Sequence, residues 1–443
     1  MTSSLPQLQI SLIIGVALII LLTAKFKVHA FFALLLACFV TGMGVQMPVV
    51  DIITTVKDGF GNIMKSLGLI IVLGTTLGVL LHHTGSTRVM AEYILKKTGK
   101  RHAALAMSIT GFIVGLPIFC DSGYIVLSGL NKSMAKRTGI SIVVMSISLA
   151  TGLLSVHCLI PPHPGAAAAA TTIGVDYGRL ILYGIGVALP VMLVGYAWAK
   201  YAGKKIKDTV IEDDEEEENT SHNPSVIMSF LPVIVPIVLI AVKSFLTIDA
   251  KAATGAMNIF SILGDPVIAL SAGVLLALAA GKKWKKDTLG KLLQEGAEKA
   301  GGILVIIGAG GAFGAVLAAT KMGDHFSQAM PLASLGILFP FLLTSVLKTA
   351  QGSSTVAIIT AASIIQPLLA SLGLQSDNGR LLCVLSMGAG SMVVSHANDA
   401  YFWVISKFSG IEMKTMLRVY SIATILMGAT GLLMVYILSM VLH

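Results

Sequence analysis

The sequence is dominated by long, continuous runs of apolar residues that short polar segments separate. A helix needs roughly 17–25 residues to cross the hydrocarbon core of a bilayer. Ten runs of about this length fall near residues 8–24, 28–46, 66–82, 139–157, 178–199, 225–246, 256–280, 301–319, 380–396 and 417–442. A transmembrane β-barrel would instead show short segments of alternating hydrophobicity. The pattern therefore predicts an all-α polytopic membrane protein.

Two further apolar stretches, near residues 102–131 and 332–371, carry polar residues in their middle. The first is broken by CDSG at 120–123 and the second by QGSST at 351–355. Backbone groups freed by such a break at membrane depth must be buried in protein or hydrated. We therefore expect each stretch to be a re-entrant hairpin that enters and leaves on one side. Two ordinary short helices with a kink are the alternative.

The two halves of the chain resemble each other. Residues 148–160 align with 387–399 at an offset of 239, which pairs His157 with His396. Shorter matches at an offset of 236 pair Gly74 with Gly310 and Gly78 with Gly314. Matches in the same order, with a broken helix in the same place, are typical of internally repeated transporters.

These matches predict two repeats, over residues 1–202 and 225–443. Each would hold five transmembrane helices and one re-entrant hairpin, with an interrupted helix at the midplane near 157–165 or 395–399. Because five is an odd number, the second repeat is inserted upside down relative to the first. Residues 203–224, with seven consecutive acids from Glu212 to Glu218, would form a solvated cytoplasmic linker.

Composition supports a membrane protein and excludes a soluble enzyme. Charged residues make up 12% of the chain and apolar residues 55%, whereas a soluble domain carries about 25% charged residues. The net charge of +9 is expected to reflect basic cytoplasmic loops rather than nucleic-acid binding. The four cysteines are far apart in apolar segments, so neither a disulfide framework, a metal site nor a cofactor is expected.

The distribution of Lys and Arg predicts the orientation. With the N-terminus outside, 22 of these residues fall on the cytoplasmic side and eight on the outer side. An excess of basic residues in cytoplasmic loops is the usual orientation signal. We therefore expect a multi-pass protein of the inner (plasma) membrane with both termini periplasmic or extracellular.

Interrupted helices in inverted repeats are typical of secondary transporters, whose site lies near the midplane where the breaks meet. Helix N-termini at such breaks present N–H groups and partial positive charge, which suits an anionic or hydroxylated solute. The polar residues of the four breaks are the predicted substrate-binding residues. They are Ser122, Gly123, His157, His163, Lys348, Gln351, Ser353, Ser354, Thr355, His396 and Asn398.

Two acids in apolar surroundings, Asp121 and Asp399, are predicted to carry a coupled proton together with His157. A charge at the bilayer centre costs about 2.5–3.5 kcal/mol on insertion scales, so such residues usually have a function. The alternative is that the acids and histidines cap helices at the breaks. Lys348 has two interpretations: it attracts a carboxylate, or it extends to the outer interface.

Four segments resemble signature segments of the gluconate permease family, which belongs to a wider ion-transporter superfamily. They are GLPIFCDSGYIVL (115–127), HCLIPPHPG (157–165), AQGSSTVAIITAA (350–362) and SHANDAYFW (395–403). The resemblance runs over essentially the whole chain. It implies proton-coupled uptake of gluconate and related sugar acids across the bacterial inner membrane. It also implies a scaffold and a transport domain, commonly in a homodimer and often with an elevator-like motion.

Three other functions compete with proton-coupled sugar-acid import. One is transport of a small amino acid such as D-serine, because some relatives carry it and Asp121 or Asp399 could pair with its ammonium. The second is coupling to Na⁺, which the hydroxyls of the hairpin could bind. The third is a membrane-embedded hydrolase, which the symmetric division of polar residues between the halves disfavours.

Overall fold

The computed structural model describes residues 5–99, 102–204, 206, 224–248, 262–281, 284, 286–320, 335–396 and 399–442. Helices and their connections make up all of this described part, which contains no strand. Seven of the described helices are long and apolar enough to cross a membrane. The predicted all-α membrane fold is therefore confirmed.

The first half of the chain contains nine α-helices in the described residues. They are α1 (Leu5–Ile20), extended by a π-helical turn at Leu21–Lys25, α2 (Ala30–Gly44), α3 (Val49–His83), α4 (Ser86–Thr98), α5 (Ala103–Gly115), α6 (Cys120–Thr138), α7 (Ile142–Leu159), α8 (Pro164–Ile173) and α9 (Tyr177–Gly203).

The second half has a similar order of helix lengths. Its described helices are α10 (Val226–Ile248), α12 (Pro266–Ala280), α13 (Lys286–Ala319), α15 (Leu338–Gln351), α16 (Ser354–Ile365), which continues into a 3₁₀ turn at Gln366–Leu368, α17 (Asp377–Gly390), α18 (Ala400–Ser409) and α19 (Met413–Val441).

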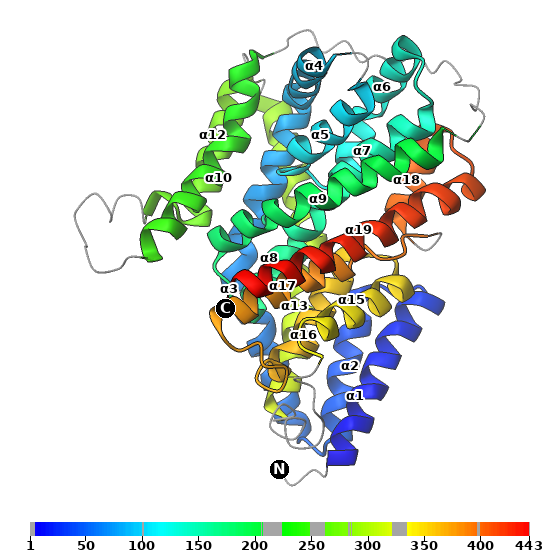
Figure 1. Ribbon diagram of the computed structural model, residues 1–443. Helices are drawn as coiled ribbons and strands as arrows, with labels where there is room; N and C mark the ends of the chain where they lie inside the picture. The colour runs from blue at the N-terminus through cyan, green and yellow to red at the C-terminus, as the bar shows by residue number, and fades with distance from the viewer. Residues whose placement is uncertain are drawn as a thin grey trace.

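All ten predicted spans overlap described helices, although residues 256–261 of the span 256–280 lie outside the described residues. Helices α3 and α13 are about twice as long as their apolar runs. They contain 35 and 34 residues, because an amphipathic, charged first half continues directly into the apolar second half. The two helices pack along each other and run through the length of the molecule (Figure 1). At Gly59 a Cβ atom would lie 2.7 Å from the carbonyl oxygen of Gly311, so these glycines let the two backbones touch.

Both interrupted apolar stretches form a pair of packed helices joined by a short turn. The α5–α6 pair occupies the upper part of Figure 1 and the α15–α16 pair the lower part. The second turn is at Gly352, whose φ of 82° suits a residue without a side chain. The first turn is at 116–119 rather than at CDSG, because Pro117 and the extended Phe119 end helical structure before Cys120.

Two further helices are interrupted where the sequence predicts it. Helix α7 ends at Leu159 and α8 begins at Pro164, so His157 is still helical and the break itself is 160–163. Helix α17 ends at Gly390 and α18 begins at Ala400. Helix α7 is the core of the molecule, since the apolar span that contains it is 94% buried. The interrupted helices therefore place their polar breaks in the interior.

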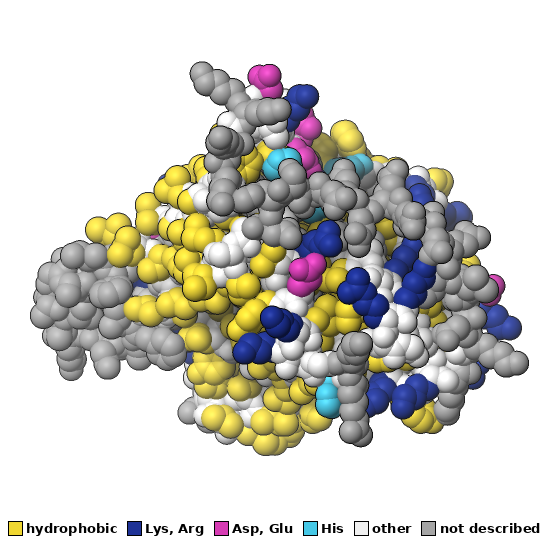
Figure 2. Space-filling model, turned by 90° about the horizontal axis from the view of Figure 1, so that it is seen from above, with side chains coloured by type: hydrophobic (Ala, Val, Ile, Leu, Met, Phe, Trp, Pro, Cys, Tyr) yellow, Lys and Arg dark blue, Asp and Glu magenta, His cyan; other side chains and the backbone are white. Residues whose placement is uncertain are grey.

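Large apolar side chains are exposed on the outer helices. Examples on α1, α10, α12 and α19 are Ile13, Ile227, Val238, Leu275, Leu433 and Met440. Figure 2 shows hydrophobic side chains covering much of one face of the molecule, with Lys and Arg gathered towards one side. A surface of this kind suits contact with lipid, as expected of a multi-pass membrane protein.

Candidate functional site

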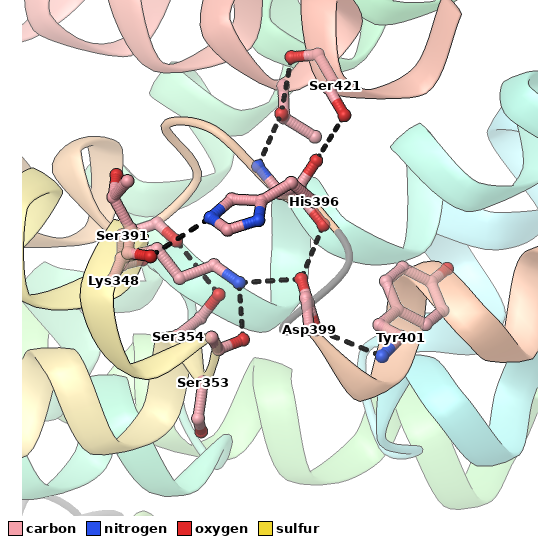
Figure 3. A network of polar contacts seen from close by, with 12 residues as sticks. Lys348, Ser353, Ser354, Ser391, His396, Asp399, Tyr401 and Ser421 are labelled. Carbon is pink, nitrogen blue, oxygen red and sulfur yellow. Dashed lines mark hydrogen bonds and ion pairs between the residues drawn. The ribbon is translucent and has the colours of Figure 1, made fainter. Parts of the chain in front are cut away.

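A buried ion pair joins the second hairpin to the break before α18 (Figure 3). Lys348 Nζ lies 2.6 Å from Oδ2 of Asp399 and donates a second hydrogen bond of 2.6 Å to the carbonyl oxygen of Gly352. The Lys348 side chain is 1% exposed. The interpretation that this lysine extends to the outer interface is therefore wrong, because the ammonium group turns inward to an acidic partner.

Asp399 is held in place by three groups. It is the N-cap of α18, and its Oδ1 accepts a hydrogen bond of 2.9 Å from the backbone N–H of Tyr401. Its Oδ2 accepts one from Ser395 Oγ as well as from Lys348. The carboxylate therefore caps a helix, as the structural alternative predicted, and also neutralises the buried lysine.

The hydroxyls of the second hairpin hold its turn and reach the neighbouring breaks. Ser353 is the N-cap of α16 and accepts a hydrogen bond from the N–H of Val356 at 3.3 Å. Ser354 Oγ donates to the carbonyl oxygen of Ser391 at 2.9 Å. Thr355 Oγ1 lies 3.4 Å from Nε2 of His157. Hydroxyls from one turn thus contact both interrupted helices.

The histidines link the breaks to the hairpins. His157 and His163 have ring centroids 4.8 Å apart, and the ring of Phe119 lies within 6.4 Å of both. His163 Nε2 is 2.7 Å from the carbonyl oxygen of Gly115 at the end of α5. His396 Nε2 is 3.0 Å from the carbonyl oxygen of Thr349 in the second hairpin. The two histidines that the repeat pairs therefore occupy different surroundings.

Three predicted residues lie in the first turn of α6. Asp121 is half-buried, lies with its Oδ1 3.7 Å from Cys120 Sγ, and interacts electrostatically with Asp399 and Lys348. Ser122 instead lines a cleft beside α3 and α13. Gly123 packs against α7, where a Cβ atom would come within 2.7 Å of Leu153. Only Asp121 of these three belongs to the polar cluster, and Asn398 lies outside the described residues.

Four helices begin at this cluster: α6, α8, α16 and α18. The first turns of α8 and α16 are in contact, since a Cβ atom at Gly165 would lie 3.3 Å from Cα of Thr355. Helix N-termini present unpaired N–H groups and partial positive charge. The arrangement can hold an anion beside a buried lysine, with hydroxyls and imidazoles at hand for further hydrogen bonds.

Some residues of the cluster were missed by the sequence reasoning about the site. Ser391 and Ser395 supply an acceptor and a donor, Tyr401 supplies the N–H that Asp399 caps, and Phe119, in the first turn, places its ring beside both His157 and His163. Ser395, Tyr401 and Phe119 lie within the quoted segments. The sequence did not reveal their partners, because the carbonyl of Ser391, the N–H of Tyr401 and the ring of Phe119 carry no polar side-chain signal, and the hydroxyl of Ser395 is like that of many other serines.

Comparisons with known proteins give a single family. Residues 8–441 match the family model described as GntP family permease. The chain is 33% identical to the gluconate permease of Pseudomonas aeruginosa, over 98% of this chain and 97% of that protein. It is 31% identical to the high-affinity gluconate transporter of Escherichia coli K12, over 97% and 98%. It is 29% identical to the D-serine transporter DsdX of the same strain, again over 97% and 98%.

Two solved transporter structures share the fold. The YdaH transporter of Alcanivorax borkumensis superposes with a TM-score of 0.62 at 17% identity, over 88% of each chain. MtrF of Neisseria gonorrhoeae superposes with a TM-score of 0.64 at 15% identity, over 88% of this chain and 84% of that one. At these identities the likeness concerns the fold.

Proposed function

Because the chain belongs to the GntP family of permeases, we propose that this transporter imports gluconate or a related small sugar acid, together with protons, across the inner membrane. The chain is a membrane transporter, and its family is not one of enzymes, which removes the hydrolase alternative. The observation that carries the proposal is the meeting of four helix N-termini around the buried Lys348–Asp399 pair.

The site suits a carboxylate that bears hydroxyl groups. Backbone N–H groups at helix starts and the hydroxyl of Thr355 can donate to a carboxylate without a buried arginine. The imidazole of His157 and the amide of Gln351 can both donate and accept, which matches the hydroxyls of an aldonate. The names of two relatives, a gluconate permease and a gluconate transporter, agree with this substrate class.

The charges around the site support the proposed proton coupling. Two acids, Asp121 and Asp399, interact electrostatically with one buried cation, Lys348, and Asp399 is already paired with it. Binding an anion there adds a negative charge where water is scarce, and a proton taken up with the anion restores the balance. Among the described ion pairs none involves Asp121, so we assign the proton to this carboxyl group.

The organisation of the chain is part of the proposal. We propose two inverted repeats, 1–202 and 225–443, with both termini outside and the 203–224 linker in the cytoplasm. In Figure 1 the C-terminal end of α9 lies on the same side as the N-terminal end of α19. Lys204 and Lys205 follow the first of these ends, and Lys414 and Arg418 lie at the second. The exposed apolar helices contact lipid, and a homodimer like those of the superfamily is proposed.

A zwitterionic amino acid is the second candidate substrate. The resemblance to DsdX, a D-serine transporter, favours it specifically. Its ammonium group could pair with Asp121. Sodium is the second candidate for the coupling ion, with Ser353 and Thr355 as hydroxyl ligands.

Counterflow in proteoliposomes tests the substrate. Purified protein is reconstituted into vesicles loaded with unlabelled gluconate, and entry of labelled gluconate from outside is followed. We expect rapid entry of chemically unchanged gluconate, inhibited by other aldonates and weakly by D-serine. Exchange of D-serine but not of gluconate would contradict the sugar-acid assignment while leaving the transporter fold untouched.

A further inference from the structure

The side-chain amide of Gln351 is enclosed but has no hydrogen-bond partner within the part of the chain that the structure describes. Both Nε2 and Oε1 are buried and unpaired among the described residues. Gln351 is also the only described residue with two such atoms in its side chain. Most buried polar side-chain atoms in proteins are paired, and an unpaired one carries its full desolvation penalty. This amide therefore requires an explanation.

The other unpaired groups have simpler explanations. Most are hydroxyls inside helices, such as Thr110 and Thr360, where rotation about χ1 can bring the hydroxyl to a carbonyl of the preceding turn. The amide of Gln351 differs from these hydroxyls because it holds a donor and an acceptor, so a rotation that brings its N–H to a backbone carbonyl leaves its Oε1 unpaired. Gln351 is the last residue of α15, directly before the left-handed Gly352.

The backbone of Gln351 belongs to the turn of the second hairpin, which supplies several groups of the polar cluster. It follows the ion-paired Lys348 by three residues and precedes Ser353, the N-cap of α16, by two. Another unpaired atom, Nδ1 of His157, lies on the ring whose Nε2 is 3.4 Å from Thr355 Oγ1. Three of the unpaired buried atoms among the described residues thus belong to the turn of the second hairpin and to the interrupted α7.

We propose that the Gln351 amide binds two adjacent hydroxyl groups of the substrate and thereby selects polyhydroxylated acids. The inference rests on the proposed function and identifies the hydroxyl groups of the substrate that this residue binds. A carboxamide offers an N–H donor and a carbonyl acceptor side by side, and a hydroxyl can be either partner. Neighbouring hydroxyls on an aldonate chain fill both positions, whereas serine has a single hydroxyl and lactate a single one beside its carboxylate.

The matching of one donor and one acceptor explains why a glutamine is suited to this position. A leucine would fill similar space without pairing either hydroxyl. A glutamate would accept from hydroxyls but repel the carboxylate of the substrate. A site built to hydrogen-bond a substrate group discriminates strongly against analogues that lack it, because its own polar groups then remain unpaired.

The test is a binding series with purified full-length protein. Wild type, Gln351→Leu and the control Thr360→Val are titrated calorimetrically with gluconate and with each of its monodeoxy analogues. Thr360 is a suitable control because its hydroxyl is also buried and unpaired but lies five residues beyond Thr355 along α16. Thr360→Val should bind every ligand as the wild type does.

The expected result is specific to two neighbouring carbons. Two adjacent monodeoxy analogues should bind the wild type about 10-fold or more weakly than gluconate, and Gln351→Leu should bind gluconate about 10- to 100-fold more weakly. The two effects should not add, so Gln351→Leu should bind those two analogues about as well as gluconate.

Several outcomes would overturn the inference. One is that Gln351→Leu weakens gluconate and all its analogues by the same factor, or does not weaken them. If Gln351→Leu fails to fold, the wild-type series alone decides, since no loss at any adjacent pair of carbons contradicts binding of a diol. Absence of gluconate binding to the wild type would instead contradict the proposed function itself.

Discussion

Lys348 Nζ and Asp399 Oδ2 lie 2.6 Å apart in the interior, and the pair joins segments 51 residues apart in sequence. The contact holds the turn between α15 and α16 against the start of α18. The same lysine also bonds the carbonyl oxygen of Gly352 in that turn. A single cation thus holds two of the four breaks together. Any ion that binds there interacts with the charge of this lysine.

The ion pair predicts strongly non-additive effects on stability. Lys348→Met or Asp399→Asn alone leaves a buried charge without its partner, which costs about 3–5 kcal/mol. Asn keeps the N-cap of α18, since Asn caps helices about as well as Asp. The double variant should therefore recover much of the loss in Tm. Additive losses in the thermal unfolding of the purified variants would show that the two charges do not depend on each other.

Asp121→Asn should separate substrate movement from proton coupling. The amide has nearly the shape of a protonated carboxyl group but cannot release a proton. We expect the variant to exchange gluconate across the membrane yet fail to accumulate it under an inward proton gradient. Uptake and counterflow in the same vesicles measure both activities. Normal accumulation by this variant would remove Asp121 as the proton carrier.

The orientation can be tested by thiol labelling in intact cells. Ser221→Cys, in the proposed cytoplasmic linker, should not react with a membrane-impermeant maleimide. Gln375→Cys is a matched control, because this exposed residue lies before α17 on the proposed outer side. The four native cysteines are buried and should contribute little background. Equal labelling at both positions in intact cells would contradict the orientation.

The carboxylate of the substrate should be necessary for binding. Gluconamide has the same hydroxyls as gluconate but no charge, so we expect it to compete poorly for the wild-type protein. Thr355→Val should weaken gluconate by about 10- to 100-fold, the effect of removing one hydrogen bond to a charged group. Competition binding measures both effects. Equal competition by the acid and the amide would remove the physical basis for an anion site.

The sequence was sufficient to predict where helices lie and where they break. Apolar runs locate membrane helices because their length and composition respond directly to the bilayer. The first halves of α3 and α13 were missed because charges such as Asp51 and Asp287 lower the hydropathy of amphipathic helical segments. The exact turn at 116–119 was missed because its residues are as apolar as the helices beside it.

The residue types of the site were predictable, but their partners were not. Lys348 stood out as a cation near a hairpin turn, yet its hydropathy cannot distinguish an interfacial lysine from one paired with Asp399. That pairing depends on how α15 packs beside the break of α17 and α18. Likewise, Ser122 and Asp121 are adjacent in sequence, but successive side chains on a helix point in different directions. Ser122 lines the cleft beside α3 and α13, whereas Asp121 interacts electrostatically with Asp399 and Lys348.

The most direct test of proton-coupled sugar-acid import is a simultaneous measurement of gluconate entry and internal pH in proteoliposomes. Vesicles containing the wild-type protein, with a pH-sensitive dye inside and no imposed gradient, are mixed with gluconate. We predict that the interior acidifies as labelled gluconate enters, and that an inward proton gradient drives gluconate above its external concentration. Entry of gluconate without acidification, and without accumulation under the gradient, would contradict the account.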